Sequence, residues 1–129
     1  VLGEWCNLGA DTNTSNLKNN YSAVKMWSYR EKRFVETGLQ FCGTVMADHS
    51  KTAINTQLNT GTVVGVAANI FKTGFPPNLI NAFTWGGAND DPKFRLDKAY
   101  ETAEIMMARR KIKLTEEDKA ILKHVYHEF

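Results

Sequence analysis

The middle of the chain repeats a pattern of six residues. Every sixth residue, starting at Met46, is aliphatic or small: Met46, Thr52, Leu58, Val64 and Ile70. Four residues after each of the first four members lies a small residue: Ser50, Thr56, Thr62 and Ala68. Residues 2–7 and 8–13 follow the same template. Such a period is typical of repeat proteins, in which each repeat buries its apolar face only against its neighbours.

A period of six does not suit an α-helix, whose apolar stripe recurs about every 3.6 residues. Six residues can make one short strand and one corner, and three such sides make one turn of a triangular coil. Stacked coils bury the aliphatic ladder, while each strand hydrogen-bonds to the coils above and below it. The pattern therefore predicts a mainly β fold, a parallel β-helix of hexapeptide repeats, over residues 1–75.

The repeats are interrupted at about residues 14–39. Residues 13–21 are rich in Asn, Ser and Lys, which is typical of an exposed loop. Residues 24–29 and 33–37 then alternate apolar and polar side chains on either side of a charged turn, which predicts a β-hairpin. Because loops on a rigid scaffold commonly carry function, this excursion is a candidate binding region.

We expect the coils to end at Phe75-Pro76-Pro77, because proline donates no backbone hydrogen bond to a neighbouring coil. Residues 76–129 would then form a C-terminal arm, with a short strand at residues 82–85. Asp91 followed by Pro92 marks the start of a first helix, which has an apolar stripe at helical spacing.

A second helix is predicted from Thr115 to the end of the chain, because Thr115 and Asp118 form a capping-box pattern. Its apolar positions lie on one side. We expect the two helices to cap or brace the open end of the coil stack.

Composition narrows the function classes. The formal net charge is +2, and 43% of residues are hydrophobic, as in a soluble globular domain. No dense basic stripe is present, so nucleic acid is not an expected partner. No apolar run is long enough to cross a bilayer and no signal-peptide pattern is visible, so we expect a cytoplasmic protein without a membrane partner. Cys6 and Cys42 are expected to be buried, reduced thiols rather than a disulfide.

The chain begins at Val1, already inside a repeat. An end coil exposes unpaired strand edges and an open apolar cross-section, which solenoids normally cover with a cap. From the sequence we therefore expect a fragment of a longer chain, preceded by further coils and by another domain.

Several linked stretches resemble one family. They are Leu8–Thr12, Gly38–Gly43, Asp48–Lys51, Asn59–Gly65 and Phe83–Gly87. Together with the hexads they are similar to the C-terminal acyltransferase domain of bifunctional sugar nucleotidyltransferases, of the Bacteroidetes-type N-acetylglucosamine-1-phosphate uridylyltransferase/glucosamine-1-phosphate acetyltransferase group. The resemblance covers nearly the whole chain.

The resemblance implies a left-handed parallel β-helix that assembles as a homotrimer. It also implies an activity, the transfer of an acetyl group from acetyl-CoA, as co-substrate, to the amine of glucosamine-1-phosphate in UDP-N-acetylglucosamine biosynthesis. The expected partners are thus an amino-sugar phosphate and an acyl-CoA. Mg²⁺ is implied only in the preceding nucleotidyltransferase domain.

The family's catalytic base is a histidine upstream of the step that begins at Leu8. The resemblance therefore implies no catalytic residue within this fragment. A positioned general base contributes roughly two to four powers of ten in rate, so we expect the fragment alone to be nearly inactive.

For the family's substrate-binding Asn-Tyr motif, two registers stay open. Counting from Leu8 selects Asn16, whereas matching by residue type selects Asn20 and Tyr21, with Lys25 near the family's lysine. Amide and phenol groups suit sugar hydroxyls, and lysine suits phosphate. The alternative is a solvated Asn-rich loop without a ligand.

His49 is the only histidine of the repeats. We assign it to substrate lining or to a structural role rather than to a second base. Adjacent residues on a strand point to opposite faces, so the side chains next to His49 do not share its face. The expected acetyl-CoA contacts are Lys51, Ala68, Arg95 and Arg109. His124 and His127 share a helix face but lack a firm third ligand, so no metal site is expected.

Two other functions compete with acetyl transfer. The first is a non-catalytic β-helix that oligomerises or regulates an attached sugar-phosphate nucleotidyltransferase. The second is a free-standing acyltransferase of another specificity.

Overall fold

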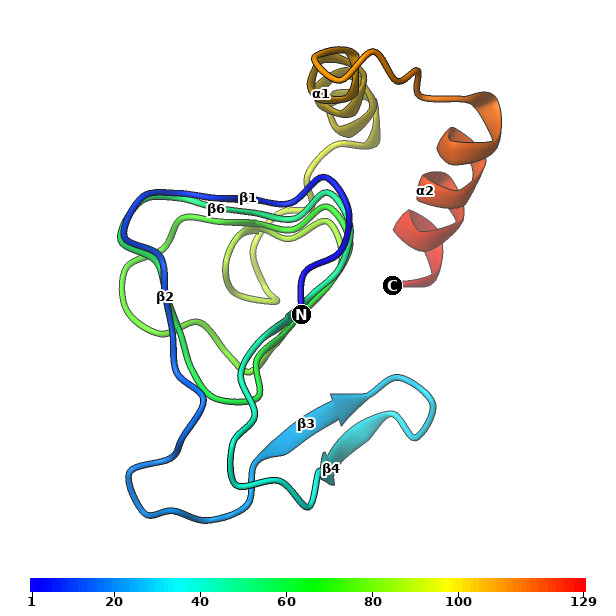
Figure 1. Ribbon diagram of the computed structural model, residues 1–129. Helices are drawn as coiled ribbons and strands as arrows, with labels where there is room; N and C mark the ends of the chain where they lie inside the picture. The colour runs from blue at the N-terminus through cyan, green and yellow to red at the C-terminus, as the bar shows by residue number, and fades with distance from the viewer.

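Each hexad folds into a two-residue strand followed by a tight corner. The computed structural model describes residues 1–129. Its elements are β1 (Asn7–Leu8), β2 (Asn13–Thr14), β3 (Lys25–Ser28), β4 (Arg33–Glu36), β5 (Val45–Met46), β6 (Lys51–Thr52), β7 (Gln57–Leu58), β8 (Val63–Val64), β9 (Asn69–Ile70), β10 (Leu79–Ile80), β11 (Trp85–Gly86), α1 (Leu96–Ala108) and α2 (Glu116–Glu128). Seen along the stack, successive turns of the chain overlie one another in a roughly triangular outline (Figure 1).

The corners explain the small fifth position of the hexad. The fourth residue of each hexad has a positive φ: Trp5, Asp11, His49, Asn55, Gly61, Ala67 and Phe83. Where the fifth residue has a hydroxyl group, its side chain donates a hydrogen bond to the backbone carbonyl of the second residue and so closes the turn. The Thr62 Oγ1, for example, donates to Asn59 O at 2.7 Å. Thr56 and Thr84 make the same bond, each at 2.8 Å. A small hydroxyl residue thus satisfies a buried carbonyl where a larger side chain would not fit.

The two-residue strands pair in parallel and form three small sheets. Sheet A has the order β10-β8-β5, sheet B has the order β1-β6-β9-β11, and sheet C contains β2 and β7. Paired residues lie in register, so that Thr52 stacks on Ile70 and Met46 on Val64. The hexad ladder from Met46 to Ile70 is at most 5% exposed, and the ladder therefore forms the interior of the stack.

The stack continues beyond the two prolines, so the expected end at Phe75 is wrong. β10 pairs in parallel with β8, and β11 with β9. A further hexad starts at Ile80, with its corner at Phe83, and the expected strand at residues 82–85 is replaced by this corner and by β11. Prolines 76 and 77 precede β10, so the ladder hydrogen bonds need no N–H group from them.

The expected hairpin is confirmed. β3 and β4 pair antiparallel, with Trp27 opposite Phe34. The hairpin projects from the stack between its first and second coils (Figure 1), and Tyr29 at its turn meets Phe129, just after α2, with ring centroids 5.4 Å apart. The two thiols are free, as expected, but they are only half-buried. The Cys6 Sγ donates to Ala47 O at 3.2 Å, and the Cys42 Sγ lies 3.2 Å from the Met26 Sδ.

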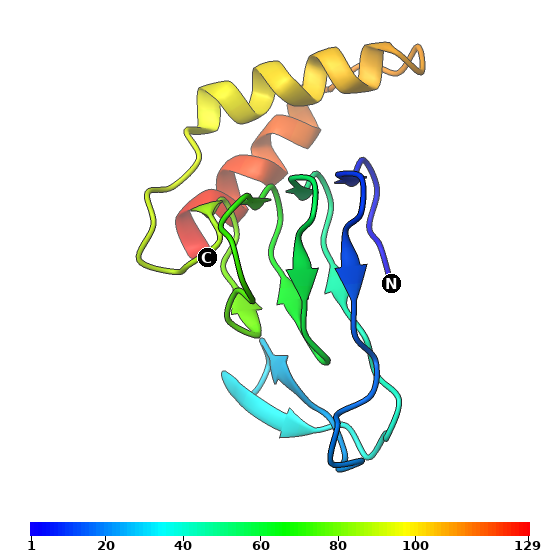
Figure 2. The same ribbon diagram turned by 90° about the vertical axis from the view of Figure 1, so that its left-hand side faces the viewer.

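The two predicted helices are present, and the capping box at Thr115 and Asp118 is confirmed. α1 begins at Leu96 and not near Pro92, because Lys93 bridges to Thr84 and keeps the chain extended. The helices do not cap an end of the stack. α1 instead runs alongside the coils (Figure 2).

The helices cover the corner at which sheets A and B meet. Their buried residues Ala99, Ala103, Met107 and Leu122 form one cluster with Ala67 and Phe83 of that corner, and Trp5 of the first coil packs against the same cluster. A second cluster, inside the stack, contains Met46, Leu58, Val64, Ala68, Ile70 and Ile80. The two helices therefore pack on the outside of the stack through an apolar cluster that is separate from the core inside the stack. None of the helices is long and apolar enough to cross a membrane.

Candidate cationic and aromatic groove

The strands of sheet B present a second row of side chains, on the outer face of the stack. Register pairs Asn7 with Lys51, Lys51 with Asn69, and Asn69 with Trp85. The inner row of the same strands contains Thr52 and Ile70, which are buried. Because side chains alternate along a strand, the outer row is free of the packing constraint that shapes the inner row.

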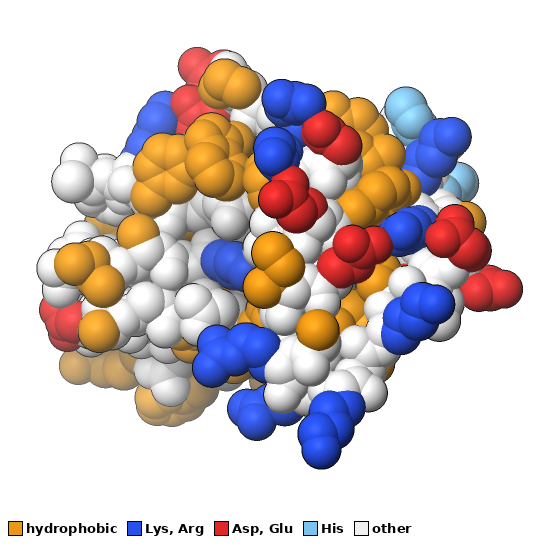
Figure 3. Space-filling view, turned by 90° about the horizontal axis from the view of Figure 1, so that it is seen from above, with side chains coloured by type: hydrophobic (Ala, Val, Ile, Leu, Met, Phe, Trp, Pro, Cys, Tyr) orange, Lys and Arg blue, Asp and Glu red, His pale blue; other side chains and the backbone are white.

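This outer row ends in a groove of about 530 Å³ between sheet B and the start of α1. The groove is lined by Asn69, Trp85, Lys93, Phe94, Arg95, Lys98 and Thr102. Three of these residues are cationic and none is acidic. Viewed from above, charged side chains of both signs gather over the helical side of the molecule (Figure 3).

The floor of the groove is aromatic. The rings of Trp85 and Phe94 stack with their centroids 4.9 Å apart and an interplanar angle of 24°. Phe71 meets the indole edge-on at 5.3 Å. Trp85 nevertheless stays 43% exposed. The two neighbours therefore hold a large aromatic surface in one orientation beside the cations.

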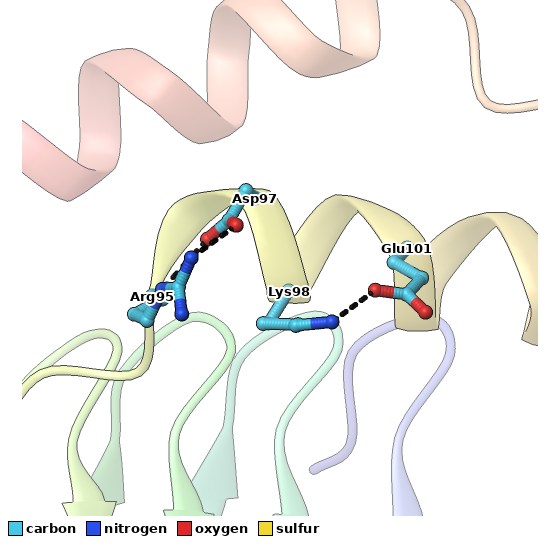
Figure 4. A network of polar contacts seen from close by, with 4 residues as sticks. All are labelled: Arg95, Asp97, Lys98 and Glu101. Atoms are coloured by element: carbon cyan, nitrogen blue, oxygen red, sulfur yellow. Dashed lines mark hydrogen bonds and ion pairs between the residues drawn. The ribbon is translucent and has the colours of Figure 1, made fainter.

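The cations are held by carboxylates that lie outside the groove lining. The Arg95 guanidinium donates to both Asp97 carboxylate oxygens, at 3.1 and 2.6 Å, and the Lys98 Nζ contacts the Glu101 Oε2 at 2.8 Å (Figure 4). The bond to Glu101 raises the pKa of Lys98. All four side chains are more than half exposed. Water screens exposed pairs of this kind, so a ligand can compete for the cations.

Lys93 is oriented differently. Its Nζ donates to Tyr126 O of α2 at 2.7 Å and lies 4.8 Å from the centroid of the Tyr126 ring. It thus joins the wall of the groove to the second helix.

Lys51 and Arg95, two of the expected acetyl-CoA contacts, belong to this side of the molecule. Lys51 is in register with Asn69, which lines the groove, although its Nζ donates to His49 O at 3.0 Å. Burial lowers the pKa of Lys51.

The other two expected contacts are not brought to the groove. Ala68 is completely buried in the core, so its side chain is not available to a ligand. Arg109 caps the C-terminal end of α1, whereas Arg95 caps its start. The two arginines are thus separated by the whole helix.

His49 lies at the corner beneath α2, with its own cavity of about 160 Å³. Its Nδ1 is buried and has no hydrogen-bond partner. Burial, followed by the charge of Lys51, lowers the pKa of His49, while Asp48 and Asp118 oppose the shift. The cavity is lined by apolar side chains of both helices, including Met107 and Leu122, and by the acidic residues Glu4, Asp48 and Asp118. His49 therefore faces the arm and does not line the groove.

The residues selected for the sugar lie in the loop before the hairpin and at the start of β3. The Asn20 Oδ1 accepts bonds from the Ser22 N–H and hydroxyl, at 3.1 and 2.8 Å, which closes a local turn. Tyr21 has φ 61° and an exposed ring, and Lys25 pairs with Glu36 at 3.6 Å. Asn16 is exposed, and its carbonyl accepts from the Cys42 N–H at 2.9 Å.

Sequence reasoning missed Asn69, Trp85 and Phe94. A signal for Trp85 was present, because it holds the sixth position of the hexad that starts at Ile80, as Lys51 and Asn69 do in their own hexads. Ile80 follows Ile70 by ten residues instead of six, so a constant six-residue spacing does not reveal this hexad. No nearby sequence pattern indicates the role of Phe94, because its position depends on how the C-terminal arm folds back on the last coil.

Comparison of this chain with protein-family models and with curated proteins finds no match.

Proposed function

We propose that this chain is an acetyltransferase domain built as a left-handed parallel β-helix, which transfers an acetyl group from acetyl-CoA to glucosamine-1-phosphate. The proposal is supported by the resemblance of the hexads and linked stretches. The observation that carries it is the outer row of sheet B, which leads from Lys51 through Asn69 to the groove at Trp85. An acyl-CoA has a thioester at one end and a phosphorylated nucleotide at the other. A long polar track that ends among cations suits such a donor.

The acceptor amine is protonated at neutral pH and must lose a proton when it attacks the thioester. His49 is neutral at that pH, because burial lowers its pKa. It nevertheless lies in the cavity under α2 and not on the donor track, so we do not assign it as the base. We assign no catalytic residue in this chain, and place the acceptor near the loop that contains Asn20 and Tyr21.

We further propose that the protein is a homotrimer and that sheet A contributes to its interface. Beside sheet A lies an apolar groove of about 370 Å³, which we call the sheet A groove. It is lined by Tyr29, Val45, Ala47, Val63, Val64, Gly65, Val66, Ala82, Val125 and Phe129. Residues from the hairpin, the stack and α2 thus form one apolar surface. Light scattering should report three copies per particle, and a stable monomer would contradict this assembly.

The alternative is a β-helix that only oligomerises or regulates an attached nucleotidyltransferase. The sheet A groove, an apolar surface suited to self-association, supports it. It requires an intact stack and an interface but no binding of acyl-CoA.

Acetyl transfer is tested on the longest natural polypeptide that contains this sequence. Purified protein is mixed with acetyl-CoA and glucosamine-1-phosphate, and the released CoA thiol is measured. We expect turnover that depends on both substrates, and a lower kcat/KM for Lys51→Ala. Absence of turnover from a protein that is folded and trimeric would reject acetyl transfer and favour the regulatory alternative.

A further inference from the structure

We infer that the groove between sheet B and α1 is a nucleotide site, in which Trp85 stacks on a base while Arg95 and Lys98 bind phosphate. The ligand class is a flat aromatic base that carries phosphate groups. One source is the adenosine end of CoA, and that assignment rests on the proposed acetyl transfer. A free or sugar-linked nucleotide is the other source, and it does not require acetyl transfer.

The aromatic floor is the first argument. Trp85 is 43% exposed, yet Phe94 stacks on it and Phe71 supports its edge. The indole is therefore oriented before any ligand arrives. Stacking of a base on such a ring contributes about 1–3 kcal/mol and tolerates different bases.

The charges beside that floor are the second argument. The lining contains Lys93, Arg95 and Lys98 but no carboxylate. Arg95 and Lys98 are balanced by Asp97 and Glu101 in exposed pairs at 2.6 and 2.8 Å. A phosphate group can replace these carboxylates, since it accepts two parallel bonds from a guanidinium and carries more charge. The two acidic residues thus compete with the ligand.

Size and the remaining polar groups agree with a small ligand. A volume of about 530 Å³ falls within the range of small-molecule sites. The Asn69 Nδ2 donates to Ala67 O at 3.1 Å, which orients the amide and leaves its oxygen as an acceptor. The Thr102 hydroxyl also lines the groove. These groups offer hydrogen bonds to a base or a ribose at the edge of the aromatic floor.

Calorimetric titration of the purified chain with CoA, ADP and UDP tests the inference. We expect at least one of the three to bind. Trp85→Ala should weaken that binding by about 5–150-fold, the range that loss of one stacking contact implies, and Trp85→Phe should restore much of it. Arg95→Ala should weaken binding of the same nucleotide, and added salt should weaken it further. Arg109→Ala is the matched control, because it removes an exposed arginine at the other end of α1 and should change nothing.

Two gain-of-affinity variants separate a nucleotide site from a structural role. Asp97→Asn and Glu101→Gln each release a groove cation from its carboxylate partner. Both should tighten nucleotide binding several-fold. A merely structural role for the ion pairs would instead predict weaker binding or no change.

The nucleotides distinguish the sources. Binding of CoA and ADP but not of UDP assigns the adenosine end of CoA, whereas tighter binding of UDP assigns a uridine nucleotide. Binding that persists without acetyl transfer would reject the proposed function but keep the site. The inference is overturned if the folded chain binds none of the three, or if binding is unaffected by both Trp85→Ala and Arg95→Ala.

Discussion

The outer faces of sheets A and B differ in chemistry although their strands belong to the same coils. Sheet A presents Val45, Val63 and Leu79 in register, and sheet B presents Lys51, Asn69 and Trp85. The inner rows of both sheets are buried from the second coil onwards, whereas Leu8 of the first coil is 40% exposed. Stacking therefore constrains the inner row alone, and each outer row is free to take up a separate function.

The arm and the hairpin turn each outer row into a groove. The segment that leads into α1 contributes Lys93 and Arg95 beside sheet B, and α1 itself adds Lys98. Phe129 at the end of the chain and Tyr29 of the hairpin add rings beside sheet A. Those two rings meet edge-to-face at 5.4 Å. The difference between the faces thus comes partly from segments that are not repeats at all.

The largest effect is expected for the inner rows, where the two sheets should respond alike. Met46→Ala in sheet A and Ile70→Ala in sheet B each remove a side chain that is at most 2% exposed. Each should lower the free energy of unfolding by about 2–5 kcal/mol, measured by urea denaturation. Val45→Ala on the outer row is the control and should lose much less. A small loss at only one inner position would show that the two sheets are not equivalent.

A smaller loss is expected at Gly65, one of the positions where the backbones of stacked coils approach closely. A Cβ at Gly65 would lie 2.3 Å from the backbone nitrogen of Ala82 in the next coil. Gly65→Ala should therefore force the coils apart and destabilise the protein by about 1–3 kcal/mol. Gly43→Ala is the matched control, because its nearest contact would be an ordinary 3.7 Å. Equal thermal stability of the two variants would contradict this tight stacking.

Substitutions on the two outer rows should show that self-association depends on sheet A and not on sheet B. Val45→Lys places a charge in the sheet A groove and should weaken self-association by about tenfold or more, as measured by light scattering over a dilution series. The variant should keep its unfolding free energy and its nucleotide binding. Lys51→Ala, on the outer row of sheet B, should leave self-association unchanged. Weaker self-association in both variants would contradict this difference in function between the two faces.

The smallest effect is expected at His49, on the corner between β5 and β6. Its pKa is lowered in the folded state, so below about pH 6.5 the unfolded chain takes up a proton that the folded chain resists. Stability should fall as the pH drops through this range, and His49→Asn should remove that part of the loss. Asn tolerates the positive φ of 62° at this position.

Urea denaturation at pH 7.5 and at pH 5.5 checks the prediction. His124→Asn, at an exposed position of α2, is the control. An unchanged pH dependence in His49→Asn would show that burial of this imidazole does not contribute to acid sensitivity.

The regular parts of the fold were predictable because they depend on local patterns. The hexad ladder, the hairpin and the capping box at Thr115 all follow from side chains close together in sequence. The coil after Ile70 does not follow from the sequence pattern, because a ten-residue step breaks the constant spacing and two prolines indicate a stop. The local signal at Pro92 predicts too early a start for α1, because the bridge from Lys93 to Thr84 is a contact with the stack that no local pattern reveals.

The candidate site was only partly predictable for the same reason. Lys51 and Arg95 were selected from the sequence, but Ala68 belongs to the buried inner row and Arg109 to the far end of α1. Trp85 and Phe94 form the floor of the groove only when the arm folds back on the last coil.

The sequence by itself determined the inner ladder and the corners, because a six-residue period leaves one inward aliphatic position and one small position in each side of a coil. Only the tertiary structure decided where the helices lie and which outer residues become neighbours. Those contacts join residues that are far apart in the chain, such as Trp5 with the α1 and α2 cluster, or Tyr29 with Phe129. Their formation depends on the burial of apolar surface between finished elements, a free energy that no short stretch of sequence contains.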